Sequence, residues 1–232
     1  MTTSIRSQFD RELRAVQDNL LRMAGLLDEA IERSIQALAE RDMELARRVV
    51  VDDFKVNDLR FKVENQCLTL IATQQPAATD LRIIIAAMNI ILDLERMADH
   101  AAGIAKIVLK MGDLPLIKPL VDIPRMADEV RGMTRTALDA YIARDVDTAK
   151  SIAKRDDVVD ELYHQVFRDL VNFLASDPSA TNRALHLLFA AHNLERIGDR
   201  AVNIAERAIY IASGEMRELD GKATEPGPGG LN

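Results

Sequence analysis

Two pairs of acidic residues recur at the same spacing in this sequence, and they are the strongest candidates for chemistry. Glu95 lies four residues before Asp99, and Glu195 lies four residues before Asp199. Side chains four apart face each other on a helix, where two like charges are destabilising by roughly 0.2–0.5 kcal/mol. A pair that weakens its own helix and yet occurs twice needs a structural or a functional explanation.

Further carboxylates interrupt an apolar row in the segment that precedes each pair. Asp53 stands in the row of residues 49–70, and Asp156 stands at the equivalent place in the row of residues 152–173. One helical turn later come Asn57 in the first row and Asp160 in the second. A carboxylate at an apolar boundary needs a compensating charge, because an unpaired one is costly or becomes protonated.

Two kinds of partner would balance these carboxylates. Arg96 and Arg196 directly follow the two glutamates, so a network of arginine–carboxylate pairs would explain the pattern structurally. Alternatively, carboxylates from neighbouring helices would form an oxygen-only cluster, which suits Mg, Mn, Ca or Fe, with Zn as a further option. The duplication favours metal, and the number of carboxylates favours a multinuclear site.

Prolines divide the chain into the helical segments that must position these groups. Pro76 and Pro178 stand alone, and three further prolines cluster between residues 115 and 124. Proline interrupts a helix, and between the breaks the apolar residues recur three and four apart. The pattern predicts six helices, over residues 6–39, 43–74, 78–111, 124–143, 146–175 and 179–213. Asp42, Asp145 and Asp177 are the expected N-caps of three of them.

An internal repeat is the main organisational feature. LERMADHAAGIA at 94–105 and LERIGDRAVNIA at 194–205 share seven of twelve residues, and an Arg-Asp pair at 41–42 recurs at 144–145. The sequence therefore predicts an all-α fold of six helices, arranged as two tandem pseudo-symmetric three-helix bundles. The expected divisions are a first repeat at 1–111, a linker at 112–123, a second repeat at 124–214 and a disordered tail at 215–232.

The repeat also predicts one apolar seam along the third helix of each half. The seam residues are Ile84, Ala87, Ile91, Leu94, Ala98, Ala101, Ala105 and Val108 in the first half, and Ala184, Leu187, Ala191, Leu194, Gly198, Ala201, Ala205 and Ala208 in the second. Small residues dominate the second seam, which permits close approach of a neighbouring helix.

Composition excludes several classes of protein. Residues 1–214 contain only six glycines and five prolines, too few for the turns of an all-β fold. The net charge of −7 and the lack of a basic stripe argue against nucleic acid as the main partner. The N-terminus has no apolar signal region, and no apolar run reaches the ~18 residues that span a bilayer. The lone Cys67 fits a reducing compartment, so we expect a cytoplasmic protein.

The motifs resemble those of the PhoU family of phosphate-uptake regulators. The resemblance rests on LERMAD and LERIGD, on QPAATDLR at 75–82 and on NIAE at 203–206, and it runs to about residue 214. It implies multinuclear iron or zinc clusters on the bundle surface, while the oxygen-only ligands leave magnesium or manganese as alternatives. Carried over by position, the implied metal ligands are Asp53, Glu95 and Asp99 in the first half and Asp156, Asp160, Glu195 and Asp199 in the second. Because Asn57 stands where the second half has Asp160, the first site is expected to bind metal more weakly.

The resemblance also implies a function without catalysis. PhoU proteins are negative regulators of phosphate uptake and of the phosphate-starvation response. They couple the Pst phosphate ABC transporter, through its PstB-type ATPase, to a PhoR-type histidine kinase, and commonly form homodimers. Contact with the membrane would be only indirect, through these partners.

Two other functions stay open from the sequence. One is a PhoU-like accessory of another phosphate transporter, and the other is a carboxylate-bridged metalloenzyme. The enzyme is disfavoured because Glu161 and His164 form the one Glu-x-x-His motif that was identified, whereas di-iron carboxylate proteins use two. The four histidines do not follow the repeat, and we expect them to be solvated or locally hydrogen-bonded.

Overall fold

The computed structural model describes residues 2–112, 114–215 and 218–219, and nearly all of them are helical. The described residues form seven α-helices and one 3-10 turn, and the predicted all-α fold is confirmed. The elements are α1 (Thr2–Glu40), α2 (Met43–Asp52), α3 (Phe54–Gln74), α4 (Ala78–Met111), α5 (Asp122–Ala143), α6 (Val146–Ser176), the 3-10 turn η1 (Pro178–Ala180) and α7 (Thr181–Ser213).

The repeated Arg-Asp pairs form the same helix-to-helix junction in both halves. Arg41 and Arg144 adopt the left-handed conformation, with φ of 59° and 56°, and so end α1 and α5. Asp42 then accepts a hydrogen bond from the Leu45 backbone N–H at 2.9 Å, as the N-cap of α2. Asp145 caps α6 in the same way. The repeat seen in the sequence is therefore also a repeat of local geometry.

The predicted single helix over 43–74 is wrong at one point, because the chain forms two helices that meet at Asp53. The Asp53 carbonyl accepts from the Val56 N–H at 3.0 Å, and its contact with the Asn57 N–H is longer, at 3.4 Å. Three consecutive valines and two aspartates precede Phe54. Valine and aspartate are weak helix formers, so this is the point at which the helix is interrupted.

Three smaller differences concern the predicted boundaries. Helix α5 begins at Asp122 instead of residue 124, within the predicted linker. Pro178 opens a 3-10 turn before α7, with the Asp177 carboxylate accepting from the Ser179 N–H at 3.1 Å. Of the predicted disordered tail, residues 216–217 and 220–232 lie outside the described residues. Leu219 is described, and its N–H donates to the Glu206 carboxylate at 2.8 Å.

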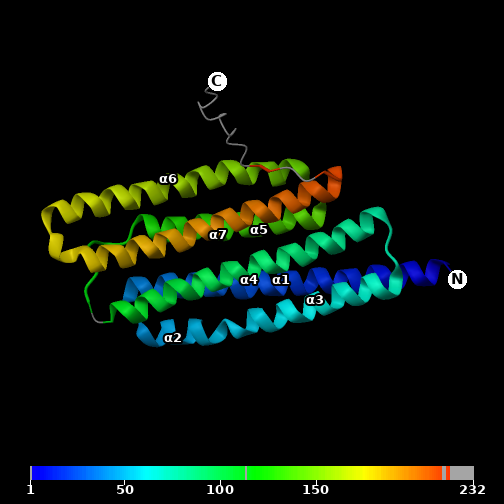
Figure 1. The fold of residues 1–232 in the computed structure, drawn as a ribbon, viewed down its shortest axis with the longest axis horizontal. Helices are drawn as coiled ribbons and strands as arrows, with labels where there is room; N and C mark the ends of the chain where they lie inside the picture. The colour runs from blue at the N-terminus through cyan, green and yellow to red at the C-terminus, as the bar shows by residue number, and fades with distance from the viewer. Residues whose placement is uncertain (1, 113, 216–217, 220–232) are drawn as a thin grey trace, which may run out of the picture.

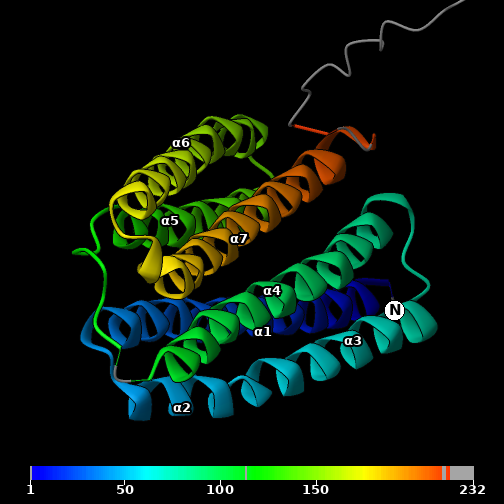
Figure 2. The ribbon, with the colours of Figure 1, turned by 60° about the vertical axis from the view of Figure 1, so that its left-hand side comes forward.

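Helices α4 and α7 form the centre of the molecule. Figure 1 shows an elongated bundle, with α6 along one edge and α2 and α3 along the opposite edge. Helix α4 packs most extensively against α7, and each also packs on the helices of its own half (Figure 2). All sixteen predicted seam residues are buried. The two three-helix bundles therefore share one continuous core.

Contacts between α4 and α7 reveal an approximate two-fold relation between the halves. Asp93 on α4 accepts from Arg200 Nη1 at 3.5 Å and from Asn203 Nδ2 at 3.3 Å on α7. Asn193 on α7 pairs with His100 on α4, with 3.0 Å between Asn193 Oδ1 and His100 Nδ1. Asn193 is the equivalent of Asp93 in the second repeat, and Arg200 is the equivalent of His100. The repeat therefore relates the Asp93–Arg200 pair to the Asn193–His100 pair. The contact is thus ionic in one of the two equivalent positions and contains an amide and a histidine in the other.

The α1–α5 contact joins equivalent positions of the two repeats with opposite charges. Arg131 lies 103 residues after Asp28, the same offset as that of the Arg-Asp pairs. Its guanidinium donates to both Asp28 carboxylate oxygens at 2.8 Å, and it also donates to Glu32 at 2.9 Å. Such a bidentate ion pair fixes the relative orientation of the two side chains and also adds stability. It holds the two halves together on the face opposite α4 and α7.

Two further observations concern Cys67 and the hydropathy of the helices. Cys67 is completely buried, and burial raises the pKa of its thiol to about 12. In the part of the chain that the structure describes, each helix is too short or too polar to cross a membrane.

Reversing the charges of the α1–α5 pair tests its contribution. Asp28→Arg and Arg131→Asp each bring like charges together, and each is expected to destabilise the fold by about 2–3 kcal/mol. The double exchange should recover at least half of the combined loss, because it restores opposite charges. Urea unfolding followed by circular dichroism measures all three. Arg22→Asp, at an exposed position of α1, is the control, and losses that simply add in the double exchange would contradict this role.

Candidate metal centre

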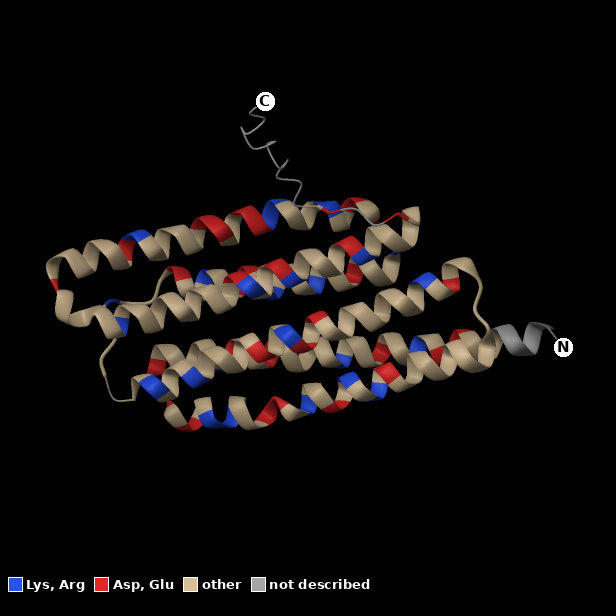
Figure 3. Ribbon diagram, viewed as in Figure 1, with Lys and Arg blue, Asp and Glu red and all other residues tan. Residues whose placement is uncertain are grey.

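Six of the seven predicted ligands lie near the middle of long helices, and the seventh lies at a helix junction. Glu95 and Asp99 lie on α4, and Glu195 and Asp199 lie at the equivalent turns of α7. Asp53 lies at the junction of α2 and α3, and the remaining two, Asp156 and Asp160, lie on α6. Figure 3 shows acidic and basic positions side by side along the central part of α4 and α7. Each half of the molecule thus contributes one cluster of carboxylates.

In the first half, Asp53, Glu95 and Asp99 are close enough to repel one another. Burial raises the pKa of Glu95, and the charge of Asp99 raises it further, with a smaller contribution from Asp53. Burial and then Asp99 also raise the pKa of Asp53, against the opposing effect of Lys106. The Asn57 amide donates to Asp53 Oδ2 at 3.4 Å. The three residues predicted for this site therefore lie close enough for their charges to interact.

The arginine that balances this cluster is Arg60 of α3. Its Nε lies 3.8 Å from Glu95 Oε1, and its guanidinium carbon lies 4.2 Å from the centre of the Phe61 ring. The sequence interpretation places Arg96 in this role, whereas the Arg96 side chain is exposed and acts on Glu95 only at longer range. The sequence did not indicate Arg60 as the partner of Glu95, because this pairing depends on how α3 packs against α4.

In the second half, Glu195 lies among charges of both signs. Burial raises its pKa first, Asp199 and Asp160 add to the increase, and Arg196 and His192 oppose it. Glu195 Oε2 lies 3.3 Å from His192 Nδ1 and 3.6 Å from Arg196 Nε. Arg196 also donates to Asp199 Oδ2 at 3.0 Å. The predicted arginine partner is therefore confirmed for Arg196 in this half.

Asp156 is the most buried of the predicted ligands, with 8% of its surface exposed. A Cβ atom at Gly198 would lie 2.9 Å from Asp156 Oδ1, so the glycine makes room for this carboxylate against α7. The equivalent position in the first half is Ala98. Asp156 thus lies beside the turn of α7 that carries Asp199, although it has no effect among those that shift the pKa of Glu195.

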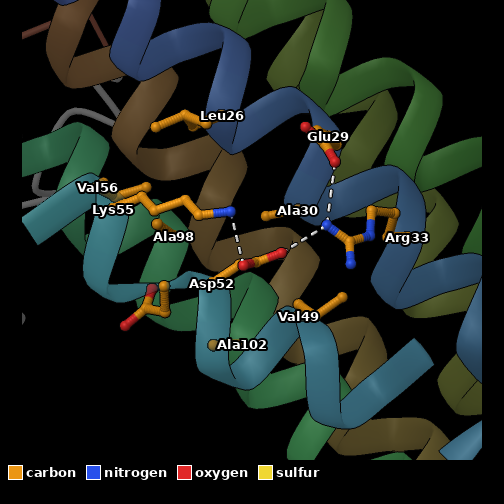
Figure 4. Close-up of a pocket in the computed structure, with 11 residues that line it drawn as sticks. Leu26, Glu29, Ala30, Arg33, Val49, Asp52, Lys55, Val56, Ala98 and Ala102 are labelled. Carbon is orange, nitrogen blue, oxygen red and sulfur yellow. Dashed lines mark hydrogen bonds and ion pairs between the residues drawn. The ribbon is translucent and has the colours of Figure 1, made fainter. Parts of the chain in front are cut away.

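A small cavity marks the place where α2 and α3 meet (Figure 4). It measures about 30 Å³, and Asp52, Asp53, Ala98 and Ala102 are among the residues that line it. Asp52 is paired with Arg33 at 2.9 Å and with Lys55 at 2.7 Å, and these hydrogen bonds lower its pKa. The adjacent Asp53 has a raised pKa. Asp52 is therefore a structural ion-pair partner, and Asp53 is the candidate ligand.

The donor atoms suit a hard or borderline cation. They are carboxylate oxygens that repel one another, and buried Glu195 Oε2 accepts no hydrogen bond. Gly198 leaves room for the Asp156 carboxylate beside the cluster of the second half. However, among the described residues no three His, Cys, Asp or Glu side chains are arranged so that they could hold a metal ion. The residue types fit metal, whereas the side chains as they stand face arginine or one another.

Other polar residues were less visible in the sequence. Asp93 is 7% exposed, and burial raises its pKa against the opposing effects of Asn203, Arg200 and Arg207. In the sequence, the only indication of a polar contact at this position is that Asn193 is the equivalent of Asp93 in the second repeat. Glu161 and His164 are both exposed on α6, and Glu161 pairs with Arg168 at 2.7 Å.

The raised pKa of Glu195 predicts how stability depends on pH. Because the folded-state pKa lies above the unfolded one, the stability that Glu195 contributes is full below its unfolded pKa and is lost as the pH rises through the folded pKa. We expect Glu195→Gln to raise the melting temperature of EDTA-treated protein by a few degrees near pH 7 and by less near pH 4.

Asp52→Asn is the matched variant with the opposite sign. The lowered pKa of Asp52 means that its contribution is present above the unfolded pKa and is lost as the pH falls through the folded pKa. This variant should therefore lower the melting temperature near pH 7. Calorimetry at both pH values measures the two changes, and equal shifts at the two pH values would contradict the assignment.

Comparisons with known proteins agree with this architecture. The family model described as the PhoU domain matches the chain twice, over residues 20–108 and 123–208. A phosphate-specific transport system accessory protein PhoU homolog of Pseudomonas putida is 37% identical over 217 residues, which cover 92% of this chain and 84% of the relative.

Two crystal structures have the same fold. PhoU from Pseudomonas aeruginosa superposes with a TM-score of 0.84 at 36% identity, covering 89% of this chain and 100% of that one. The phosphate transport system regulatory protein PhoU from Streptococcus pneumoniae superposes with a TM-score of 0.83 at 31% identity, covering 90% and 99%. Two family matches, one in each half of the repeat, and relatives that align along almost the whole chain show that this protein belongs to the PhoU family.

Proposed function

We propose that this protein is an accessory protein of a phosphate-specific transport system and a negative regulator of phosphate uptake and of the phosphate-starvation response. The observation that carries the proposal is the 37% identity, over 92% of the chain, to a relative described as an accessory protein of that system. A second relative of known structure is described as a regulatory protein of phosphate transport.

The proposed mechanism is protein–protein contact in the cytoplasm. The protein would bind the PstB-type ATPase of the transporter and a PhoR-type histidine kinase, and favour the inhibited state of the kinase when phosphate is plentiful. Long helices that pack side by side present extended faces for such contacts, and the same property suits the proposed homodimer. The proposal includes no catalysed reaction.

The two carboxylate clusters are the proposed metal sites. Asp53, Glu95 and Asp99 would hold ions in the first half, and the second site would use Asp156, Asp160, Glu195 and Asp199. Iron or zinc is the proposed metal, with magnesium or manganese as alternatives. A bound cation would supply positive charge to carboxylates that now repel one another. Neutral clusters on the helix surface would then be able to order or bridge a contact with a partner.

Removing the ligands of one cluster tests the metal sites. We expect the double change Glu195→Ala and Asp199→Ala to lower the metal content of purified protein without unfolding the bundle, because both side chains are partly exposed. Glu95→Ala with Asp99→Ala should lower it less, since the first cluster has one carboxylate fewer. Elemental analysis by mass spectrometry measures bound metal, and circular dichroism checks the fold. Unchanged metal content in both double variants would remove the metal sites from the proposal.

Deleting the gene tests the regulatory function. Phosphate-responsive genes should stay expressed in phosphate-rich medium in the deletion strain, and the wild-type gene should restore repression. A pull-down of the full chain with the kinase and with the transporter ATPase, each with and without added metal, identifies the partners. Normal repression in the deletion strain would overturn the regulatory function even if metal binds.

A further inference from the structure

We propose that Arg196 and Arg60 are built-in counter-ions of the two carboxylate clusters, and that a metal ion binds only by displacing them. Metal binding and release of arginine would then be a single equilibrium in each half of the protein. The inference rests on the metal sites of the proposed function, and it adds what controls their occupancy.

Arg196 lies beside both carboxylates of the second Glu-x-x-x-Asp motif. Its Nη1 is 3.0 Å from Asp199 Oδ2, and its Nε is 3.6 Å from Glu195 Oε2. The guanidinium thus contacts an oxygen of both carboxylates in the Glu-x-x-x-Asp motif. Arginine keeps its charge at all relevant pH values, so it cannot leave these oxygens by losing a proton. A metal ion that needs the same oxygens must move the side chain.

The first half uses a different arginine for the same purpose. Arg60 of α3 lies 3.8 Å from Glu95 Oε1, and it is shared with Glu64, whose Oε2 lies 3.7 Å from Arg60 Nη1. Tyr163 stands at the position equivalent to Arg60 in the second repeat, and Arg96 stands at the position equivalent to Arg196. The shortest contact between arginine and a cluster carboxylate is 3.8 Å in the first half and 3.0 Å in the second. Displacing Arg60 should therefore be easier than displacing Arg196.

These ion pairs account for the arrangement of the carboxylates. Asp199 contacts Arg196, and Glu195 contacts both His192 and Arg196. Among the described residues, no three metal-ligating side chains converge. Arg196 and His192 together do not offset burial and the charges of Asp199 and Asp160, so the pKa of Glu195 stays raised. A divalent cation carries more charge on a smaller ion, so it can replace the arginine.

Displacement has a consequence at the surface. The Arg196 side chain is already 48% exposed, at the outer side of α7. Once a metal ion occupies Glu195 and Asp199, the guanidinium has no carboxylate of the motif left and extends into solvent. Metal occupancy would thus expose a basic group beside the cluster, which suits contact with an acidic surface of a partner protein.

Calorimetric titration of Mn²⁺ and, separately, Zn²⁺ into the EDTA-treated full chain tests the exchange. The variant with Glu95→Ala and Asp99→Ala serves as background for the second site. Removing the competing charge by Arg196→Gln should raise affinity there about 3–10-fold, because it deletes two ion pairs. Arg196→Lys, which keeps a positive charge, should stay within about twofold of the starting protein.

The first site is measured in the reverse background, with Glu195→Ala and Asp199→Ala. Arg60→Gln should raise affinity about 2–3-fold, because the contact it removes is long and shared with Glu64. Arg96→Gln is the matched control from the equivalent position of the repeat, and it should leave affinity at either site nearly unchanged. Circular dichroism confirms that each variant is folded.

Nuclear magnetic resonance of arginine side chains supplies a readout that does not depend on affinity. The Nε–H signal of Arg196, assigned with Arg196→Lys, should shift as the second site fills and should not shift in the protein with Glu195→Ala and Asp199→Ala. If Arg196→Gln binds metal with unchanged affinity and the Arg196 signal does not shift, the proposed exchange is wrong, although the metal sites are still supported. No binding of either metal to the wild-type chain would overturn the sites and the exchange together.

Discussion

The packing of α4 against α7 is the interaction on which the rest of the structure depends. Each of these helices lies between its own bundle and the other half, so apolar or small residues must occupy most of its circumference. Asp93 is the buried exception, since Arg200 and Asn203 donate to it within the interface. Glu95, Asp99, Glu195 and Asp199 lie on the remaining, partly exposed surface, because the core occupies the other faces of both helices.

The same constraint makes the electrostatics of the clusters unusual. A carboxylate on an exposed helix is solvated and has little effect on its neighbours, but these lie at the boundary of a large core, where burial is the leading cause of the raised pKa of Glu95, Glu195 and Asp53. Arg60 and Arg196 relieve only part of the repulsion. The clusters therefore hold negative charge that only nearby arginine and histidine side chains offset.

The repeat explains the shape, and its departures from symmetry give the two halves different properties. Asp28 and Arg131 occupy equivalent positions and carry opposite charges, so the contact that joins the halves is specific to the pairing of one repeat with the other. At the α4–α7 interface the carboxylate of Asp93 is replaced by Asn193 in the second repeat. Two copies of either repeat would lose this complementarity, because like charges would meet at the α1–α5 contact.

The sequence alone determined the helical class, the two-fold repeat, both buried seams and the seven candidate ligands, because helical periodicity and repeated motifs are local patterns that survive without knowledge of packing. The tertiary structure decided what each charge faces. The bend at Asp53 separates the paired Asp52 from the ligand candidate Asp53, and the approach of α3 to α4 gives Glu95 the partner Arg60 instead of the adjacent Arg96. Such pairings depend on distances between helices that are far apart in the chain, and spacing along one helix carries no information about them.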